Sequence, residues 1–314
     1  MKKISIVVPC YNEEKNVENV VNEVTELFRN NLDNYDYEIL FIDNCSKDKT
    51  QEKLEYICSR DKKIKAIFNA ANFTAENSML YGLIQSTGDC AIILHADLQY
   101  PVSKIPEFIK AWEDGHTVVC GVKEKTSENI FMHFLRILFY KMIRSSASVR
   151  IVNQFTGYGL YDRNFIKIID QVHDPLPIFR GVIGEYAKHV KTIPFPLGKR
   201  KFGITSAPVS RLYDIAWLNL TSYSKVAIRW SMFFGLIGIL FSIIFSIYFI
   251  ISKFINWDVF PPGIPSIVIC VCFFGGIQLI ILSVLGEYIY TINQRLMKLN
   301  RPIVIEEKRI NFEQ

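Results

Sequence analysis

Short apolar runs alternate with longer mixed segments along the first hundred residues of this chain. Four runs rich in Ile and Val have the length and composition of buried strands, and they cover residues 4–9, 37–43, 64–68 and 92–94. The segments between them predict helices at about 15–30, 48–60 and 72–86, and the first of these places its valines on one face. Alternating strands and helices predict an α/β fold with a doubly wound, mostly parallel sheet and right-handed crossovers.

Polar side chains follow three of these strands at the point where each strand ends. They are Pro9, Tyr11 and Glu13 after the first strand, Asp43 at the end of the second, and His95, Asp97 and Gln99 after the fourth. The carboxyl ends of parallel strands meet at one edge of a sheet, and ligands bind there in open α/β sheets. The pattern therefore predicts one ligand site built from three loops.

The residues after the fourth strand form a candidate metal site. His95, Asp97 and Gln99 are two positions apart, so in an extended segment all three point to the same side. Oxygen ligands suit Mg²⁺ or Mn²⁺, and an imidazole can join a Mn²⁺ site. The alternative is a strand followed by an Asx-type turn. Asp43 has two interpretations as well, as an acceptor for a base or ribose and as a turn-forming residue.

The second half of the chain contains two long stretches without charge. They cover residues 230–251 and 264–286, and about 20 apolar residues suffice to cross a bilayer. The loop between the two stretches has one basic residue, Lys253, whereas the outer flanks have Arg211, Lys225, Arg229, Arg295, Lys298 and Arg301. By the positive-inside rule, two membrane helices then leave both termini and the domain that precedes the helices in the cytoplasm. Two buried core helices are the alternative.

This pattern predicts three parts, a cytoplasmic domain at 1–226, a transmembrane hairpin at 227–294 and a cytoplasmic tail at 295–314. Within the first part, residues 130–144 predict a helix with Arg136, Lys141 and Arg144 placed to reach lipid headgroups. An ordinary core helix is the alternative. Residues 175–181 and 197–203 predict loops, and the two glycines of 156–162 predict close approach of the backbone to a ligand.

Composition narrows the classes of partner. Half of the 314 residues are hydrophobic, and the net charge is only +5, which argues against a strongly basic nucleic-acid binder. The seven cysteines show neither a CxxC pair nor the spacing of a disulfide scaffold, so we expect reduced thiols. There is no GxGxxG or Walker A motif, so a metal and basic side chains would have to hold any phosphates.

Seven short motifs, in order, carry a resemblance to a known family. They are PCYNE at 9–13, IDNCSKD at 42–48, NF at 72–73, GD at 88–89, ADLQYP at 96–101, TGYGLYDR at 156–163 and FRG at 179–181. The chain resembles family 2 glycosyltransferases with the Rossmann-like GT-A fold over about residues 4–230. It is most similar to the polyprenyl-phosphate branch, which contains dolichol-phosphate mannose synthase and bacterial GtrB-type enzymes with two membrane spans.

The resemblance implies transfer of one sugar from a UDP- or GDP-linked donor to polyprenyl (undecaprenyl) phosphate, with inversion. It places the enzyme at the cytoplasmic face of the inner membrane, where it feeds modification of cell-surface polysaccharide such as lipopolysaccharide. The implied metal is Mg²⁺ or Mn²⁺. The residues implied are Asp97, Gln99 and His95 for the metal, Pro9, Tyr11, Glu13 and Asp43 for the nucleoside, and Lys123, Arg180, Lys199 and Arg200 for the acceptor phosphate. For the basic loop at 199–201, a solvated turn is the alternative.

The chain also departs from the family pattern at several positions. Asn44 stands where a second acid is common, His95 where Asp is usual, and Ala71 and Thr74 replace an Arg and a Gly. The later loop, residues 203–206, lacks the usual Lys. These departures bear on the choice of sugar and on the strength of metal binding.

Two other functions remain open at this point. A processive polysaccharide synthase is one, but Val226 stands where the Gln of a Gln-x-x-Arg-Trp signature would precede Arg229 and Trp230, and two spans are few for a polymer channel. The other is a non-catalytic membrane scaffold, which the departures at Asn44 and His95 motivate. The number of subunits is open too, with a homo-oligomer among the options.

Overall fold

The computed structural model describes residues 1–124, 155–171, 179–198, 264–298 and 304–312, together with isolated positions between 237 and 255. The predicted helix at 130–144, most of the predicted span at 230–251, and the basic residues Lys199 and Arg200 lie outside the described residues. The chain divides into two compact units. One contains the whole sheet, and the other contains the long helix α10 (Ile264–Lys298).

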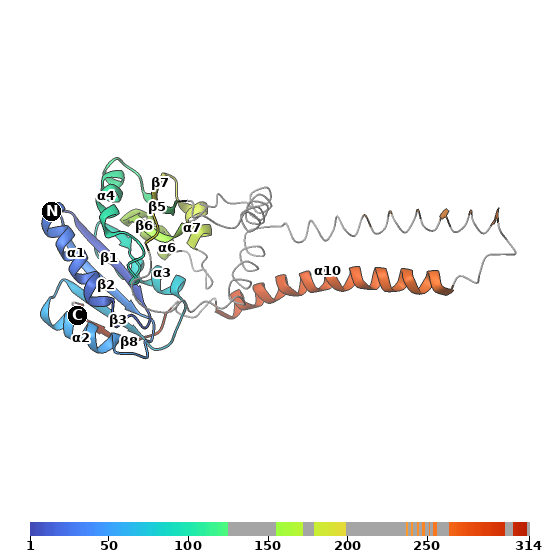
Figure 1. Ribbon diagram of the computed structural model, residues 1–314, viewed down its shortest axis with the longest axis horizontal. Helices are drawn as coiled ribbons and strands as arrows, with labels where there is room; N and C mark the ends of the chain where they lie inside the picture. The colour runs from blue at the N-terminus through green and yellow to red at the C-terminus, as the bar shows by residue number, and fades with distance from the viewer. Residues whose placement is uncertain are drawn as a thin grey trace. The chain divides into compact units, whose positions relative to one another are not determined.

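The described strands form one sheet in the order β7-β5-β6-β4-β1-β2-β3-β8 (Figure 1). The strands are β1 (Lys3–Cys10), β2 (Asp36–Asp43), β3 (Ile64–Asn69), β4 (Cys90–Ile93), β5 (Val118–Lys123), β6 (Phe155–Asp162), β7 (Val190–Phe195) and β8 (Glu306–Ile310). The pairs β1–β2, β1–β4, β2–β3 and β5–β7 are parallel, whereas β6 and β8 pair antiparallel with their neighbours. The predicted α/β fold with a mostly parallel sheet is therefore confirmed.

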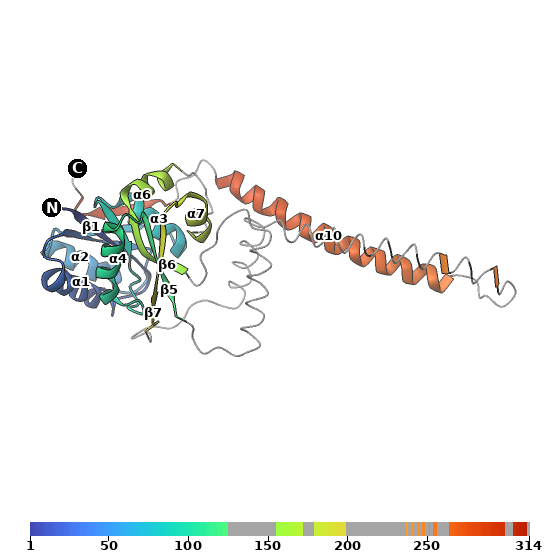
Figure 2. The same cartoon turned by 90° about the horizontal axis from the view of Figure 1, so that it is seen from above.

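Helices cover both faces of the sheet. The first face carries α1 (Val17–Asn31), α2 (Thr50–Arg60) and the turn η1 (Val102–Lys104) with α4 (Ile105–Glu113). The second face carries α3 (Ala75–Gln85), α6 (Arg163–Asp170) and α7 (Phe179–Tyr186), and Figure 2 shows these three gathered on one side. Because α7 begins at Phe179, the loop predicted through residue 181 ends earlier than expected.

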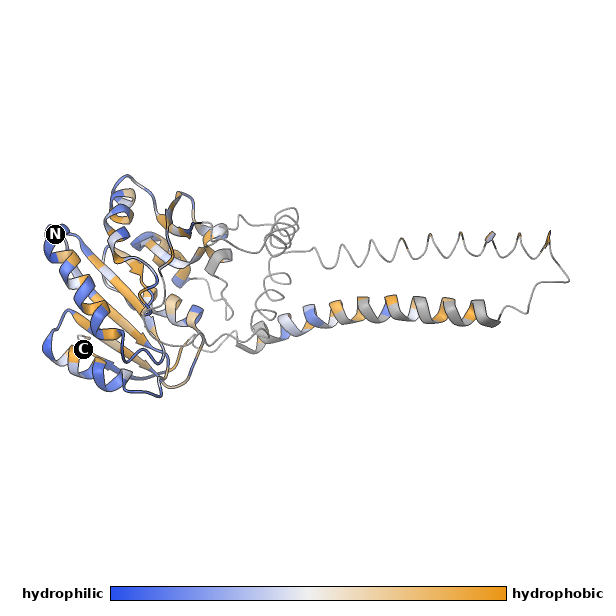
Figure 3. Cartoon of the chain, viewed as in Figure 1, coloured by the Kyte–Doolittle hydropathy of each residue, from blue (hydrophilic) through white to orange (hydrophobic). Residues whose placement is uncertain are grey.

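Alternation along the strands explains this layering. In β1, Ile4, Ile6 and Val8 face the first helical layer, while Val7 faces the second, and all four are fully buried. A strand covered on both faces needs apolar residues on both, which is why the sequence shows continuous runs of Ile and Val. Figure 3 shows these strands as hydrophobic bands between helices with hydrophilic outer surfaces.

The two glycines of residues 156–162 have a packing role in the structure. These residues belong to β6, which pairs antiparallel with both β4 and β5. A Cβ atom on Gly159 would lie 2.2 Å from the carbonyl oxygen of Val119, and one on Gly157 would lie 2.7 Å from Sδ of Met79. The glycines thus permit close packing within the protein, and close approach of this backbone to a ligand stays a prediction.

The structure also corrects the tail predicted at 295–314. Helix α10 continues to Lys298, and residues 306–310 return to the catalytic sheet as β8, the antiparallel neighbour of β3. The side chain of Asn311 donates hydrogen bonds to the carbonyl oxygens of Cys58 and Ile64, both at 2.7 Å. Residues 306–311 are therefore part of the domain that contains the sheet.

Helix α10 contains the whole of the second predicted span, residues 264–286. Within the part of the chain that the structure describes, no helix combines the length and the hydropathy that a bilayer crossing requires.

A buried ion-pair cluster lies near the amino ends of β1 and β2. The Glu38 carboxylate is 3.0 Å from Nζ of Lys3 and 2.9 Å from Nζ of Lys65, and it accepts hydrogen bonds from Ser5 and Thr87. Burial would raise the pKa of the Glu38 carboxyl, but the hydrogen bonds from Ser5, Lys65 and Thr87 outweigh burial and lower this pKa to about 2. Glu38 therefore stays ionised in the folded protein.

We expect Glu38→Gln to lower the free energy of unfolding by about 3 kcal/mol at neutral pH, since each pKa unit corresponds to about 1.4 kcal/mol. The folded-state pKa lies below the unfolded one, so this stabilisation is complete above about pH 5 and is lost as the pH falls toward about 2. Urea unfolding at pH 7 and pH 3 should show a larger acid loss for the wild type than for the variant.

The control is Glu107→Gln, which removes the exposed pair between Lys104 and Glu107 (2.6 Å). Its effect should stay below about 1 kcal/mol because solvent screens exposed pairs. Equal effects of the two variants would contradict the role assigned to Glu38.

Candidate functional site

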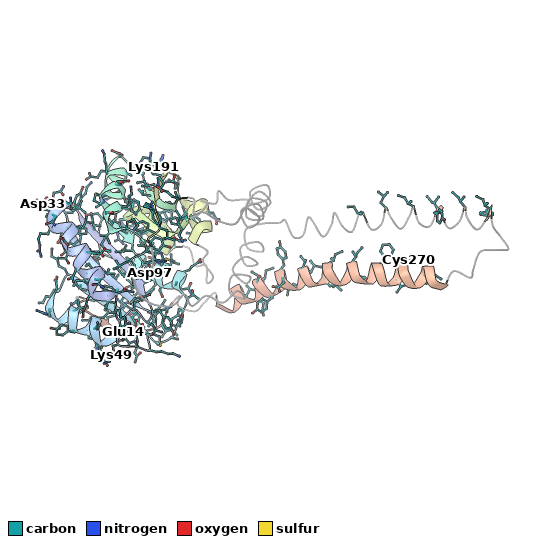
Figure 4. The ribbon with its side chains drawn as sticks, in the orientation of Figure 1. Glu14, Asp33, Lys49, Asp97, Lys191 and Cys270 are labelled. Carbon is teal, nitrogen blue, oxygen red and sulfur yellow. The ribbon has the colours of Figure 1, made fainter. Side chains whose placement is uncertain are left out.

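The loops after β1 and β2 interlock at the carboxyl edge of the sheet. The backbone N–H of Asn12 donates to Oγ of Ser46 at 2.9 Å, and Oδ1 of Asn12 accepts from the N–H of Lys47 at 2.8 Å. The N–H of Lys49 donates to the Glu14 carboxylate at 3.2 Å, and Figure 4 shows these two residues close together. Two loops that are separate in sequence therefore form one rigid wall.

The structure places the predicted nucleoside-binding residues of the first loop in this wall. Pro9, the residue before the last one of β1, is in register with Ile42, and the Tyr11 side chain is exposed. Glu13 is buried, with its N–H donating to Oγ1 of Thr50 and its carboxylate accepting from the Asn16 amide at 2.5 Å. Of these three residues, Tyr11 has the most exposed side chain and Glu13 helps to order the loop.

Asp43, the fourth predicted nucleoside residue, is fully buried beside the same loops. Its carboxylate accepts hydrogen bonds from the Ser46 N–H at 3.1 Å, from the Ser46 hydroxyl, and from the Gln51 amide at 2.8 Å. These donors all come from the loop and helix that follow β2. Asp43 therefore has the turn-forming role that the sequence left open as the alternative, and its contact with a nucleoside stays a prediction.

A buried amide network, which the sequence analysis missed, joins the ends of β2 and β3. Oδ1 of Asn44 accepts from the Asn69 amide at 3.2 Å and from the Phe73 N–H at 2.9 Å, and its NH₂ donates to Asn72 at 3.0 Å. A carboxylate at position 44 could accept but not donate. Asn44, the departure from the family acid, thus holds the loop that leads into α3. The available signal was three asparagines at two neighbouring strand ends.

The loop after β4 carries the predicted metal residues. Asp97 and Gln99 are half-buried, and Oδ1 of Asp97 accepts the Gln99 N–H at 3.2 Å, as in the Asx-type turn of the alternative interpretation. Leu98 between them has φ 54°, so the segment is not extended as the sequence analysis assumed. A turn does not exclude a metal, because one carboxylate accepts several bonds.

His95 lies on the same loop, and its ring stacks on Tyr100 with centroids 4.3 Å apart. The imidazole hydrogen-bonds to the backbone of Thr156, whereas its buried Nε2 has no hydrogen-bond partner. Burial lowers the pKa of His95 below its usual value, although the nearby Asp97 carboxylate and the Thr156 bond act in the opposite direction. The imidazole is therefore neutral near pH 7 and keeps a lone pair on Nε2.

Lys123, a predicted acceptor-phosphate residue, belongs to the same cluster. Its Nζ lies 5.6 Å from the ring centroid of Tyr100, and its charge acts on His95. The Tyr100 hydroxyl is 2.9 Å from Oγ1 of Thr156, so the aromatic ring has a fixed position. The end of β5 thus brings a cation to the loop that carries Asp97. Tyr100 and Thr156 are further residues that the sequence analysis did not assign to the site.

The structure describes less of the other predicted basic residues. Arg180 lies near the start of α7, and its side chain is not described. Lys199 and Arg200 lie outside the described residues, but Gly198, directly before them, donates its N–H to the carbonyl oxygen of Gln99 at 2.9 Å. The residue directly before the predicted basic loop therefore contacts the Asp97 loop.

No group of three His, Cys, Asp or Glu side chains suited to a metal occurs among the described residues. The Asp97 loop nevertheless offers the donor chemistry that Mg²⁺ and Mn²⁺ prefer, a carboxylate and the amide oxygen of Gln99, at the edge of the sheet. Substrate phosphates and water commonly complete such sites. The donor set therefore fits a divalent ion that is shared with a bound diphosphate.

Backbone strain gathers at this edge. Each of the loops after the first four strands contains a non-glycine residue with positive φ, and these are Asn12, Cys45, Thr74 and Leu98. Thr74 has φ 79° and ψ 155°, a region that is essentially restricted to glycine. Such strain persists where the surrounding structure fixes the chain, and it is typical of binding sites.

We expect Thr74→Gly to raise the free energy of unfolding by about 1 kcal/mol, because relief of strain outweighs the greater chain entropy of glycine. Thr74→Ala keeps the strain and should change stability little. Thermal unfolding of the three proteins in one detergent measures the difference. A lower unfolding temperature for the glycine variant would show that Thr74 is not strained.

Comparison with known proteins places this site in a family. The model of glycosyl transferase family 2 matches residues 5–171. The bactoprenol glucosyl transferase of Shigella phage SfII is 27% identical over 98% of both chains, and a prophage bactoprenol glucosyl transferase homolog of Escherichia coli (strain K12) is 27% identical over 91% of this chain and 93% of its own. The solved structure of S. aureus TarS 1–349 with UDP covers 70% of this chain and 64% of its own, with 14% identity and a TM-score of 0.43. Because the family model spans more than half of the chain, this protein belongs to glycosyl transferase family 2 and is a glycosyltransferase.

Proposed function

We propose that this enzyme transfers one sugar from a UDP- or GDP-linked donor to polyprenyl (undecaprenyl) phosphate, with inversion at the anomeric carbon. The reaction takes place at the cytoplasmic face of the inner membrane and supplies sugar for the modification of cell-surface polysaccharide. The relatives named bactoprenol glucosyl transferase support this acceptor, because one of them aligns over 98% of this chain, including the part beyond the catalytic sheet.

Within the structure, the observation that supports the proposal most directly is a hydrogen bond. The N–H of Gly198 donates to the carbonyl oxygen of Gln99. Lys199, Arg200 and Lys201 follow Gly198 directly in the sequence. The described residue that precedes three successive cations therefore contacts the loop with Asp97. Transfer from a diphosphate to a phosphate needs these two loops together, because both substrates are anionic.

Asp97 and Gln99 would hold Mg²⁺ or Mn²⁺. When bound, the ion neutralises charge on the departing diphosphate. The interlocked loops after β1 and β2 form the wall for the nucleoside, with Pro9 at the strand end and the exposed Tyr11 ring available for stacking on a base. Buried Glu13 and Asp43 keep this wall in shape.

The acceptor phosphate is already an anion at neutral pH, so it needs little help from a general base. The chain contributes position and positive charge instead, from Lys123, Lys199, Arg200 and Arg180. Direct attack of the phosphate oxygen on the anomeric carbon, opposite to the departing diphosphate, inverts the configuration. A long polyprenyl chain explains why such an enzyme would need a membrane anchor.

The proposed anchor is the hairpin at 227–294. Large apolar side chains of α10 are exposed, including Ile267, Val271 and Leu282. Exposed apolar surface of this kind marks contact with a membrane or with another protein. Arg295 and Lys298 lie in the last turn of α10 and Arg301 follows it in the sequence, and these cations match the cytoplasmic side of a bilayer.

The decisive test incubates membranes that contain the enzyme with labelled UDP- and GDP-sugars and undecaprenyl phosphate, and identifies the labelled lipid. We expect a lipid with one sugar, and Asp97→Asn should lower its formation by at least about a hundredfold, the loss of several kcal/mol of charge stabilisation. Asp114→Asn, at the exposed end of α4, is the matched control and should leave the rate unchanged. A long polymer as product, or normal turnover by Asp97→Asn, would refute the proposal.

Lys123→Met should lower the activity of the enzyme toward the phosphate acceptor. Hydrogen bonds to charged groups contribute about 1.5–3 kcal/mol, so we expect kcat/KM for the phosphate acceptor to fall by about ten- to a hundredfold. Lys191→Met changes an exposed lysine of the adjacent strand β7 and should have no effect. Equal activities of the two variants would remove Lys123 from the site.

A further inference from the structure

Strand β8 is held at both ends of its contact with β3. At one end, the side chain of Asn311 donates hydrogen bonds to the carbonyl oxygens of Cys58 and Ile64, just before and at the start of β3. At the other end, the carbonyl oxygen of Ile305 accepts the N–H of Ala70 at 2.9 Å. The pairing therefore reaches the first residue after β3. We call residues 70–74, between β3 and α3, the β3–α3 loop.

A β-bulge in β8 decides which of its side chains face α3. Consecutive residues of β3 pair with Lys308 and Glu306, so Glu307 is an extra residue in β8. In a regular strand, positions 306 and 309 would point to opposite faces of the sheet. With the extra residue, Glu306 and Arg309 point to the same face, and both contact Tyr81 of α3.

Tyr81, Glu306 and Arg309 form a charged contact between β8 and α3, which we call the β8 clamp. The Tyr81 hydroxyl donates to the Glu306 carboxylate, which also accepts two hydrogen bonds from the Arg309 guanidinium. Burial and the bond to Glu306 raise the pKa of Tyr81 to about 12, so the hydroxyl keeps its proton and stays a donor. Hydrogen bonds to an ionised partner are roughly twice as strong as neutral ones.

Asn69, the last residue of β3, connects the paired strands to the β3–α3 loop. Its amide donates to Oδ1 of Asn44 at 3.2 Å and to Oγ of Ser78 at 3.5 Å. The same oxygen of Asn44 accepts the N–H of Phe73, and the Ser78 hydroxyl donates to the carbonyl oxygen of Thr74 at 3.1 Å. The position of the loop, including the strained Thr74, therefore depends on where β3 and α3 lie.

The β3–α3 loop lies next to the candidate site. Phe68 pairs with Asp43, so the loop leaves the sheet beside the interlocked loop that follows β2. A strand that only covered the edge of β3 would need no more than backbone hydrogen bonds. The β8 clamp adds a side-chain contact to α3, the helix that follows the loop. The loop is thus fixed at its start by β8 pairing and at its end by the clamp.

We propose that the β8 clamp positions the β3–α3 loop for the nucleotide-sugar donor, and that Tyr81 and Glu306 are positioning residues for donor binding. The inference rests on the proposed function for the nucleotide in the donor. It assigns a role in donor affinity to a strand that lies more than 200 residues after the loop in the sequence.

The test measures binding of UDP and GDP to the full-length protein in detergent with Mg²⁺, by isothermal titration calorimetry. Tyr81→Phe removes one hydroxyl and leaves the pair between Glu306 and Arg309 in place. We expect the Kd of the bound nucleotide to rise about three- to tenfold, the range typical of coupling through a network of contacts. Unfolded molecules would lower the number of binding sites and leave Kd unchanged, so the measurement separates positioning from stability.

The matched control is Lys308→Met on the same strand. Lys308 pairs with Glu55 of α2 at 2.7 Å, on the opposite face from Tyr81, and both side chains are exposed. Its Kd should equal that of the wild type. Glu306→Gln should raise Kd as Tyr81→Phe does, and the double variant should raise it by less than the product of the two single effects, because both residues act through one contact.

Each result separates this inference from the proposed function. Nucleotide binding that is unchanged in both Tyr81→Phe and Glu306→Gln, or weakened equally in Lys308→Met, would overturn the role of the clamp and leave the proposed function intact. Failure of the wild type to bind UDP or GDP would overturn the proposed donor. Hydrogen exchange then tests the clamp by itself, since the amides of residues 70–78 should exchange faster in Tyr81→Phe, and equal exchange would overturn the positioning of the loop.

Discussion

The parallel pairing of β1 with β2 on one side and β4 on the other is the constraint on which the site depends. In this register Cys10 lies opposite Asp43, and Val7 lies opposite Ile93, so three chain segments leave the sheet at the same edge. A shift of one residue would turn every buried side chain of β1 to the opposite face. The two hydrophobic layers fix the register of the strands. They therefore fix where the loops that carry Glu13, Asp43 and Asp97 leave the sheet.

Rigid strands allow strained loops. The four non-glycine residues with positive φ after β1 to β4 persist because the strands and the hydrogen bonds between the loops leave the chain no better path. Asn44 shows how such bonds are shared, since its one amide joins a residue of β3 and a residue of the loop before α3. The site thus depends on hydrogen bonds with defined directions. The core beneath it depends only on apolar side chains that fill its volume.

The parallel strands β1 to β4 could be predicted from the sequence, whereas the antiparallel strands β6 and β8 could not. The reason is physical. Strands β1 to β4 are covered on both faces, so their Ile and Val runs stand out locally. Strand β6 alternates glycine and tyrosine, which resembles a loop, because its glycines serve close packing against Met79 and Val119. Strand β8 is charged and short, and it pairs with a strand more than 230 residues earlier, which no local pattern can indicate.

The features of the candidate site also divide into those that the sequence could predict and those that it could not. Motifs located the loops with Pro9, Tyr11, Asp97 and Gln99, and the strand end placed Lys123. The hydrogen-bond partners of Asp43 and the stacking of His95 on Tyr100 depend on side-chain directions that spacing does not determine. Leu98 changed the geometry assumed for the Asp97 segment, since a left-handed residue turns a segment that alternation alone would make extended.

Strand β8 makes the catalytic sheet discontinuous along the chain, and this affects biosynthesis. The sheet lacks its last strand until residues 306–310 have left the ribosome, after every apolar segment of the chain has been made. Until then β3 is an open edge with unpaired backbone groups, the kind of edge that recruits strands from other chains. Nascent molecules would therefore need protection at β3 until β8 is added.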